Sequence, residues 1–169
     1  MVGTVLQEDR HAAGGANKTA ALRVQNSGRI FPNVSPVYLQ AFVVEDNPTI
    51  RENLIGTLEE LTCIKVTGTS ATEDDALAWL GQNPDRWDIM IVDLFLKQGS
   101  GMHLAQQITG RRPNQKVVVF SNYINANVRK RCAQLGVDAV FDKSTEIDSL
   151  VDYCSHQCFL IARTNTQAA

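Results

Sequence analysis

The chain of 169 residues carries a formal net charge of −2, and 44% of its residues are hydrophobic while 20% are charged. Its length suits one domain with a tail, and its near-neutral charge gives no sign of a basic surface for nucleic acid or anionic membranes. The four cysteines form no CxxC pair, and we see no secretory leader or membrane-spanning apolar run. We therefore expect reduced thiols in a cytoplasmic protein.

Composition changes near residue 37. Residues 1–36 are rich in Ala, Gly, Asn, Thr and Ser and end in FPNVSP, which predicts a flexible N-terminal tail. The pattern is regular over residues 37–162, which we expect to form the folded domain. Residues 163–169 are expected to be a short C-terminal tail.

Short apolar segments alternate with helical patterns from residue 38 onward. Asn47 and Pro48 suit the cap and first position of one helix, and Thr72 with Asp75 resembles a capping box at the next. A helix is expected after each of five strands: YLQAFVVED (38–46), CIKVTGTS (63–70), DIMIVDLFL (88–96), QKVVVFSNY (115–123) and VDAVFDKS (137–144). This alternation predicts an α/β fold, a doubly wound five-stranded parallel sheet flanked by five helices.

Polar residues occupy the ends of these strands, where ligands bind in such sheets. Glu45 and Asp46 end the first strand, and Asp93 lies in the third. Two carboxylates about 5 Å apart repel by roughly 3 kcal/mol at an effective dielectric of 20. A hard divalent cation with oxygen ligands relieves this repulsion, so we expect Mg²⁺ here. Ser121 and Lys143 end the fourth and fifth strands and should converge on the same edge.

These residues resemble the receiver domain of two-component response regulators. The acid pair in VVEDN, Asp93 in IMIVDLFL, Ser121 in VVVFSNY and Lys143 in VFDKS occur in the family's order, and Gly101 lies where receivers usually have glycine. The resemblance covers about residues 38–160. It implies a flavodoxin-like sheet with strand order 2-1-3-4-5.

The resemblance also implies roles for these residues. Asp93 would accept a phosphoryl group from a phosphohistidine of a sensor kinase, which is covalent chemistry at a carboxylate. Mg²⁺ would be held by Glu45, Asp46, Asp93 and the backbone carbonyl of Phe95. Lys143 would pair with a phosphoryl oxygen, and Ser121 would donate a hydrogen bond to another and draw its loop inward.

The resemblance further implies a bacterial protein that catalyses only its own phosphorylation and dephosphorylation, and so is not an enzyme in the usual sense. Only RTNTQAA follows the last expected helix, so we expect a receiver that stands alone, without direct DNA binding or membrane attachment. Its partners would be a sensor histidine kinase or phosphotransfer protein and a downstream protein target. A homodimer through helix 4, strand 5 and helix 5 is also possible in this family.

Several positions depart from the family pattern. Receivers usually have an aromatic residue three positions before the lysine, but here Val140 occupies it and Phe141 follows, facing the other side of the strand. Valine is stiff and too small to act as a moving ring. We therefore expect phosphorylation to move residues 121–127, with little change at Val140. Phe95 and Tyr123 are bulky and would shield a phosphoryl group from water.

Other interpretations remain open from the sequence. A small aspartyl-phosphate phosphatase would have a DxD pair on its first strand, which is absent here. A flavodoxin-like module for a phosphorylated ligand would have a Gly-rich or Ser/Thr-rich loop after that strand. A receiver-like docking module without phosphorylation is the third alternative.

The remaining polar residues favour structural roles. Cys154 and Cys158 flank His156, but helical spacing places both cysteines on the apolar stripe and His156 elsewhere, which favours core packing over a metal site. His103 is expected on the surface of the third helix.

Overall fold

The computed structural model describes residues 37–167, which form a five-stranded parallel sheet in the order β2-β1-β3-β4-β5. This confirms the predicted fold class and strand order. The strands are β1 (Leu39–Val44), β2 (Ile64–Ser70), β3 (Ile89–Val92), β4 (Lys116–Ser121) and β5 (Ala139–Asp142). They are shorter than the apolar segments of the sequence, because β3 ends at Val92 and β5 at Asp142.

The helices begin at the capping residues that the sequence provides. They are α1 (Pro48–Leu61), α2 (Glu73–Gln82), α3 (Gly101–Gln107), α4 (Ala126–Gln134) and α5 (Ile147–Gln167). The Asn47 side chain accepts hydrogen bonds from the backbone N–H groups of Thr49 and Ile50, and Pro48 occupies the first turn, where its missing N–H costs nothing. The Thr72 side chain caps α2 in the same way through Asp75 N–H. Both predicted helix starts are confirmed.

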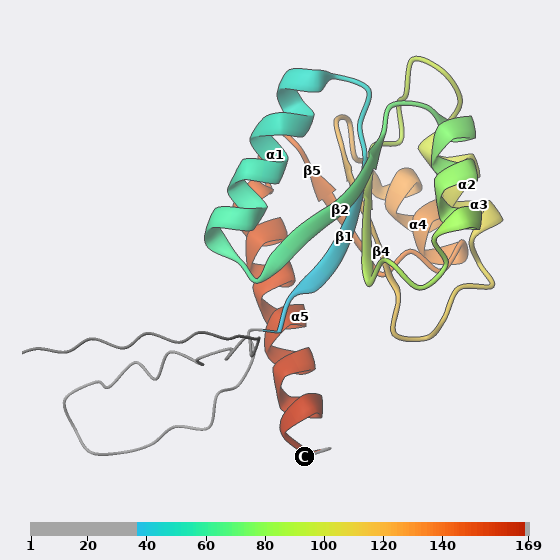
Figure 1. Cartoon of the computed structure of the whole chain (residues 1–169). Coiled ribbons are helices and arrows are strands. Elements are labelled where there is room, and N and C mark those ends of the chain that lie inside the picture. The colour runs from blue at the N-terminus through green and yellow to red at the C-terminus, as the bar shows by residue number, and fades with distance from the viewer. Residues whose placement is uncertain (1–36, 168–169) are drawn as a thin grey trace, which may run out of the picture. The chain divides into compact units, whose positions relative to one another are not determined.

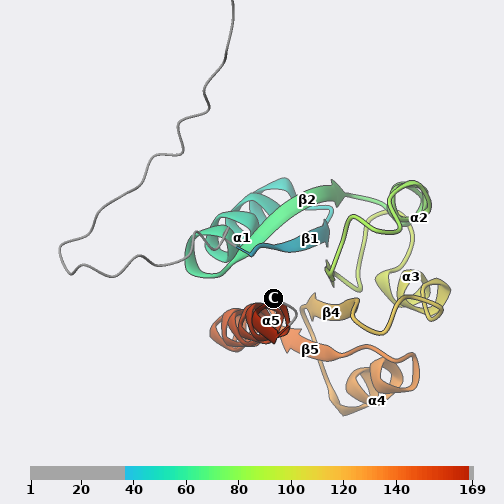
Figure 2. The same ribbon diagram turned by 60° about the horizontal axis from the view of Figure 1, so that its bottom comes forward.

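Helices cover both faces of the sheet (Figures 1 and 2). Helices α1 and α5 lie on one face, and α2, α3 and α4 lie on the other. Successive residues of β1 alternate between the two cores: Phe42 and Val44 pack toward α2–α4, whereas Ala41 and Val43 pack toward α1 and α5. Burial on both faces explains why the strand sequences are continuously apolar.

The cysteines correct one expectation. Cys63 and Cys158 form a disulfide that joins the segment before β2 to α5, so the expectation of reduced thiols is wrong for this pair. Cys132 and Cys154 are free and buried. Cys154 is a core residue as expected, and His156 is exposed.

The expected tail over residues 1–36 lies outside the described residues. Helix α5 continues to Gln167, past the boundary expected at residue 162. Across residues 37–167, the helices are too short or too polar to cross a membrane.

Candidate functional site

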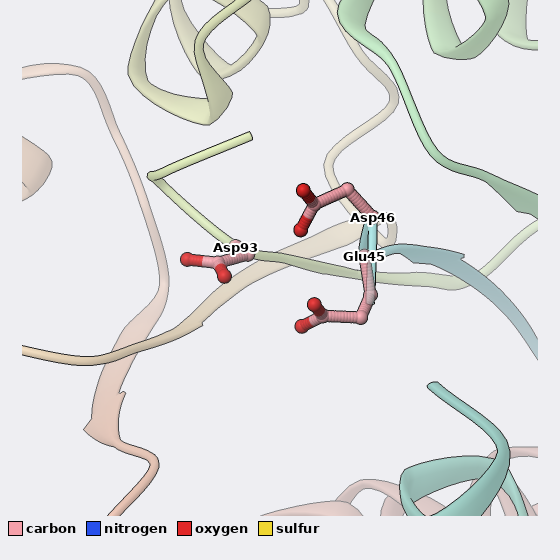
Figure 3. A group of neighbouring side chains, drawn as sticks. All are labelled: Glu45, Asp46 and Asp93. Carbon is pink, nitrogen blue, oxygen red and sulfur yellow. The ribbon is translucent and has the colours of Figure 1, made fainter. Parts of the chain in front are cut away.

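Three acids meet at the carboxyl ends of β1 and β3. The backbone N–H of Glu45 donates to Ser70 O at the end of β2 (3.0 Å), and that of Asp93 donates to Val44 O (2.9 Å), so the strand ends stay in register. One carboxylate oxygen each of Glu45, Asp46 and Asp93 lies within 4.8 Å of the others. Figure 3 shows Glu45 and Asp46 on one segment, beside Asp93 on its neighbour. We call these three residues the carboxylate cluster.

Lys143, directly after β5, and Ser121, the last residue of β4, complete the site. The Lys143 ammonium contacts both Glu45 and Asp93, and its side chain is only 8% exposed. The Ser121 hydroxyl donates to Asp93 Oδ1 and is fully buried. The Phe95 N–H donates to the same oxygen at 3.1 Å. Every side chain that the sequence assigned to this edge is therefore brought together.

The role of the Phe95 backbone carbonyl as a ligand of Mg²⁺, by contrast, stays a prediction. Asp93 and Lys143 each lie one residue beyond their strand, whereas the sequence had placed them within β3 and β5. The apolar pattern runs on into Leu94, Phe95 and Leu96, so it gives no sign that strand pairing stops before Asp93.

The charge of the site is not balanced. Three carboxylates face one buried ammonium. Lys97 lies 3.8 Å from Asp46 with its side chain 77% exposed, and the Arg51 guanidinium donates to the backbone carbonyl of Glu45 (2.8 Å) rather than to a carboxylate. A divalent cation would restore neutrality, and hard oxygen ligands suit Mg²⁺. A pocket of about 450 Å³ opens over the cluster, with Phe95 and Tyr123 in its wall. The residues therefore fit the expected metal.

The loop that carries Asp93 is held by two contacts. A Cβ on Gly101 would lie 1.9 Å from the Asp93 carbonyl oxygen, so only glycine fits beneath the loop. Glu73, at the start of α2, accepts from Ser100 N–H at 2.8 Å and contacts the His103 ring. The hydrogen bond with His103, followed by that from Ser100, lowers the pKa of Glu73.

Sequence reasoning had placed His103 on the surface, which is confirmed, but missed its contact with Glu73. The two residues are 30 positions apart, and no local pattern connects them.

Val140 and Phe141 face opposite cores, as the sequence predicted. Val140 packs toward α2–α4, and Phe141 packs toward α1 and α5 against the Tyr153 ring. The Val140 carbonyl accepts a hydrogen bond from the Arg129 guanidinium on α4 (2.6 Å), and the same guanidinium pairs with Glu146 (2.7 Å). A side chain of α4 thus fixes the backbone where receivers usually have an aromatic ring.

Comparison with known proteins supports the resemblance to receiver domains. The model of the response regulator receiver domain family matches residues 41–155. Among curated proteins, the chain is 25% identical over 114 residues to the response regulator protein VraR of Staphylococcus saprophyticus; the match covers 68% of this chain and 54% of VraR, about half its length.

Solved structures show the same fold. A DNA-binding response regulator of the LuxR family from Staphylococcus aureus is 16% identical, with a TM-score of 0.63 over 71% of this chain and 98% of that one. The phosphorylated cyanobacterial phytochrome response regulator RcpA is 25% identical, with a TM-score of 0.56 over 71% of this chain and 91% of that one.

These relatives correct the expectation that direct DNA binding is unlikely. That expectation rested on the few residues after α5, yet one of the similar structures is a DNA-binding response regulator and the match spans only about half of VraR. A receiver fold carries no information on the output attached to it. The expectation of no direct DNA binding is therefore wrong, and the expectation that the receiver stands alone is not confirmed.

Proposed function

The chain belongs to the family of response regulator receiver domains, and on that premise we propose that Asp93 accepts a phosphoryl group from a phosphohistidine of a sensor kinase. The observation that carries the proposal is the environment of the Asp93 carboxylate. One oxygen accepts from Ser121 and Phe95, and the other contacts Lys143. Asp93 is only 7% exposed and lies in the wall of the pocket.

The proposed step forms a bond between an Asp93 oxygen and phosphorus while the bond between phosphorus and the histidine nitrogen breaks. The leaving imidazole takes up a proton, and the acyl phosphate stays on Asp93. Lys143 then pairs with a phosphoryl oxygen in place of the Asp93 carboxylate oxygen, and the Ser121 hydroxyl donates to another. Positioning and charge neutralisation of this kind supply most of the catalysis in phosphoryl transfer.

Mg²⁺ is the proposed cofactor, held by the carboxylate cluster with the Phe95 carbonyl. When bound, it offsets the negative charge of the phosphoryl group and of the acids. The charge count supports it, because three carboxylates meet one buried ammonium, Lys143, and one exposed ammonium, Lys97.

The proposed signal is a rearrangement of residues 121–127. Tyr123 has a φ of 58° although it is not glycine, and its side chain is 84% exposed. Such a backbone conformation costs free energy unless packing supports it. A movement of the loop, when Ser121 follows a phosphoryl group, would allow Tyr123 to adopt a more favourable backbone conformation. Val140 is proposed to stay in place because Arg129 holds its carbonyl.

We also propose that the protein acts only on its own Asp93, in the cytoplasm, and is no general phosphatase. The RcpA structure, at 25% identity, is of a phosphorylated response regulator, which favours this reading over a docking module without phosphorylation.

Intact-mass measurement after incubation with Mg²⁺ and a small acyl phosphate tests the nucleophile. The wild type should gain one phosphoryl group and Asp93→Asn none. Asp85→Asn, the same substitution at a carboxylate whose side chain is 76% exposed, is the matched control and should gain one group. Full phosphorylation of Asp93→Asn would show that another residue is the nucleophile. Consumption of the donor at a rate higher than that at which phosphorylated Asp93 loses its phosphoryl group would favour an enzyme.

Backbone amide shifts by NMR, with and without beryllofluoride, test the signal. We expect large changes over residues 121–127 and small ones at Val140. Ser121→Ala should remove the loop response, and Val140→Ala should keep it. The reverse order would place the trigger at position 140.

A further inference from the structure

The Cys63–Cys158 disulfide lies at the edge of the sheet opposite the carboxylate cluster. It closes 95 residues of chain with a Cα–Cα distance of 5.8 Å. Cys63 directly precedes β2, and its carbonyl accepts from Leu39 N–H at the start of β1 (3.2 Å). The bond therefore ties α5 to the starts of β1 and β2, at the opposite ends of the strands from the proposed phosphorylation site.

The other two cysteines provide an internal contrast. Cys132 and Cys154 are fully buried. Burial raises the pKa of the Cys154 thiol to about 12 and also raises that of Cys132. Since thiolates are the reactive species in exchange, burial and the raised pKa both disfavour exchange at these two thiols. Cys63 and Cys158 are, by contrast, only partly buried.

Packing along α5 weakens toward the disulfide. Leu150 and Cys154 are completely buried on the apolar stripe, Cys158 one turn later is only partly buried, and the neighbouring Phe159 is 56% exposed. The match to the receiver family ends at residue 155. Helix α5 continues past the matched residues, and Cys158 lies three residues beyond them.

We propose that Cys63 and Cys158 are a thiol–disulfide exchange site whose substrates are small thiols and disulfides of the glutathione kind. Its oxidation state sets whether α5 from Cys158 onward is held against the sheet. Opening the bond removes the covalent link between α5 and Cys63 and so loosens this segment, while Leu150 and Cys154 keep the first half of α5 in place.

The exchange needs only glutathione in its thiol and disulfide forms. In reduction, two glutathione thiols give up two electrons and two protons, the S–S bond breaks through a mixed disulfide, and two cysteine thiols and one glutathione disulfide result. Oxidation is the reverse. Protein disulfides in reducing compartments are mostly transient or redox-sensing, which agrees with a reversible bond in the proposed cytoplasmic location.

The experiment uses the full chain equilibrated in glutathione buffers from fully reduced to fully oxidised. Thiols are trapped by alkylation and counted by intact mass, and amide hydrogen exchange is measured in parallel. We expect Cys63 and Cys158 to pass together from bonded to free across this range. We also expect exchange over residues 158–163 to become at least tenfold faster on reduction, with residues 93–97 unchanged.

Variants separate this site from the other cysteines. Cys158→Ser should show the fast exchange in every buffer, whereas Cys132→Ala should behave as the wild type. Cys63→Ser, on a partly exposed segment, answers the same question if Cys158→Ser does not fold. A bond that survives the most reducing buffer, or two variants that both fail to fold, would make it a permanent cross-link and overturn the proposal. Thiols that never pair in the oxidised buffer, or unchanged exchange in α5, would overturn it too.

Discussion

Two charged clusters lie at opposite edges of the sheet and differ in their charge balance. In the carboxylate cluster, Glu45 and Asp93 share one buried ammonium beneath an open pocket, and Asp46 pairs only with an exposed lysine. At the other edge, the Asp138 carboxylate accepts from Arg111 (2.8 Å), Lys116 (3.3 Å) and the backbone N–H of Val117 (2.8 Å).

The difference shows how function can be separated from structure. The single negative charge of Asp138 is compensated by two cations, Arg111 and Lys116, and its hydrogen bond with Val117 N–H holds the start of β4. This group therefore needs no further ion or ligand to balance its charge. The carboxylate cluster is incomplete, because an excess of buried negative charge costs free energy unless a cation or a reaction uses it. Charge that is buried, unbalanced and open to a pocket is thus the better indicator of a functional site.

Substitution of Lys143 should have the largest effect on this contrast. Lys143→Met leaves Glu45 and Asp93 without their shared cation, and loss of one partner of a buried ion pair typically costs about 3–5 kcal/mol. We expect a loss of that order in the free energy of unfolding without Mg²⁺, measured by urea denaturation, and slower phosphorylation.

Lys97→Met is the matched control, since Lys97 also lies beside the cluster but is exposed. An exposed pair contributes less than about 1 kcal/mol, so its loss should be small. Equal losses in the two variants would show that burial of Lys143 does not matter.

Substitution of Asp138 should have an intermediate effect on stability and none on phosphorylation. Asp138→Asn removes the charge from both ion pairs but keeps an oxygen for Val117 N–H. Because the Asp138 side chain is 22% exposed, we expect a loss of roughly 1–2 kcal/mol in urea denaturation. Phosphorylation measured by mass should match the wild type. A defect in phosphorylation would mean that the two edges are coupled and would undo the comparison.

The sequence predicted the carboxylate cluster better than its surroundings. Glu45, Asp93, Ser121 and Lys143 each lie at or directly after the end of an apolar strand. Parallel strands bring their carboxyl ends to one edge of the sheet, so local patterns suffice to predict that these side chains meet. The fold class followed from the same alternation, whereas the strand order followed from the resemblance to receiver domains. Strand ends were less accurate, because the apolar run continues past Asp93 although pairing stops at Val92.

Contacts between distant elements could not be predicted in this way. Cys63 reads locally as the start of a strand and Cys158 as one position on an apolar helix stripe, and nothing in either pattern indicates a bond across 95 residues. Glu73 and His103 are a similar case, since each lies on a different helix. These contacts depend on how helices dock on the sheet, which residue periodicity does not specify.

The smallest expected effect concerns Asp46, the most accessible acid of the cluster. Its carboxylate accepts from Lys97 N–H at 3.2 Å and its side chain is 12% exposed, so it already has a partner and reaches the pocket. A ligand that binds only the folded state stabilises it by about 1.4 kcal/mol at ten times its Kd. We expect thermal unfolding of the wild type to shift upward with Mg²⁺ by an amount of this order, and Asp46→Asn to lose most of the shift.

Asp85→Asn is the control here as well, because it removes one acid far from the cluster and should keep the whole shift. Without Mg²⁺, Asp46→Asn should be as stable as the wild type or slightly more stable, since one of three mutually repelling charges is gone. That combination is specific to a site whose acids are held together for a cation. If Asp46→Asn kept the full shift, Asp46 would not be a ligand; if it were clearly less stable without Mg²⁺, the cluster would be a balanced structural group like that of Asp138, and the contrast between the two edges would fail.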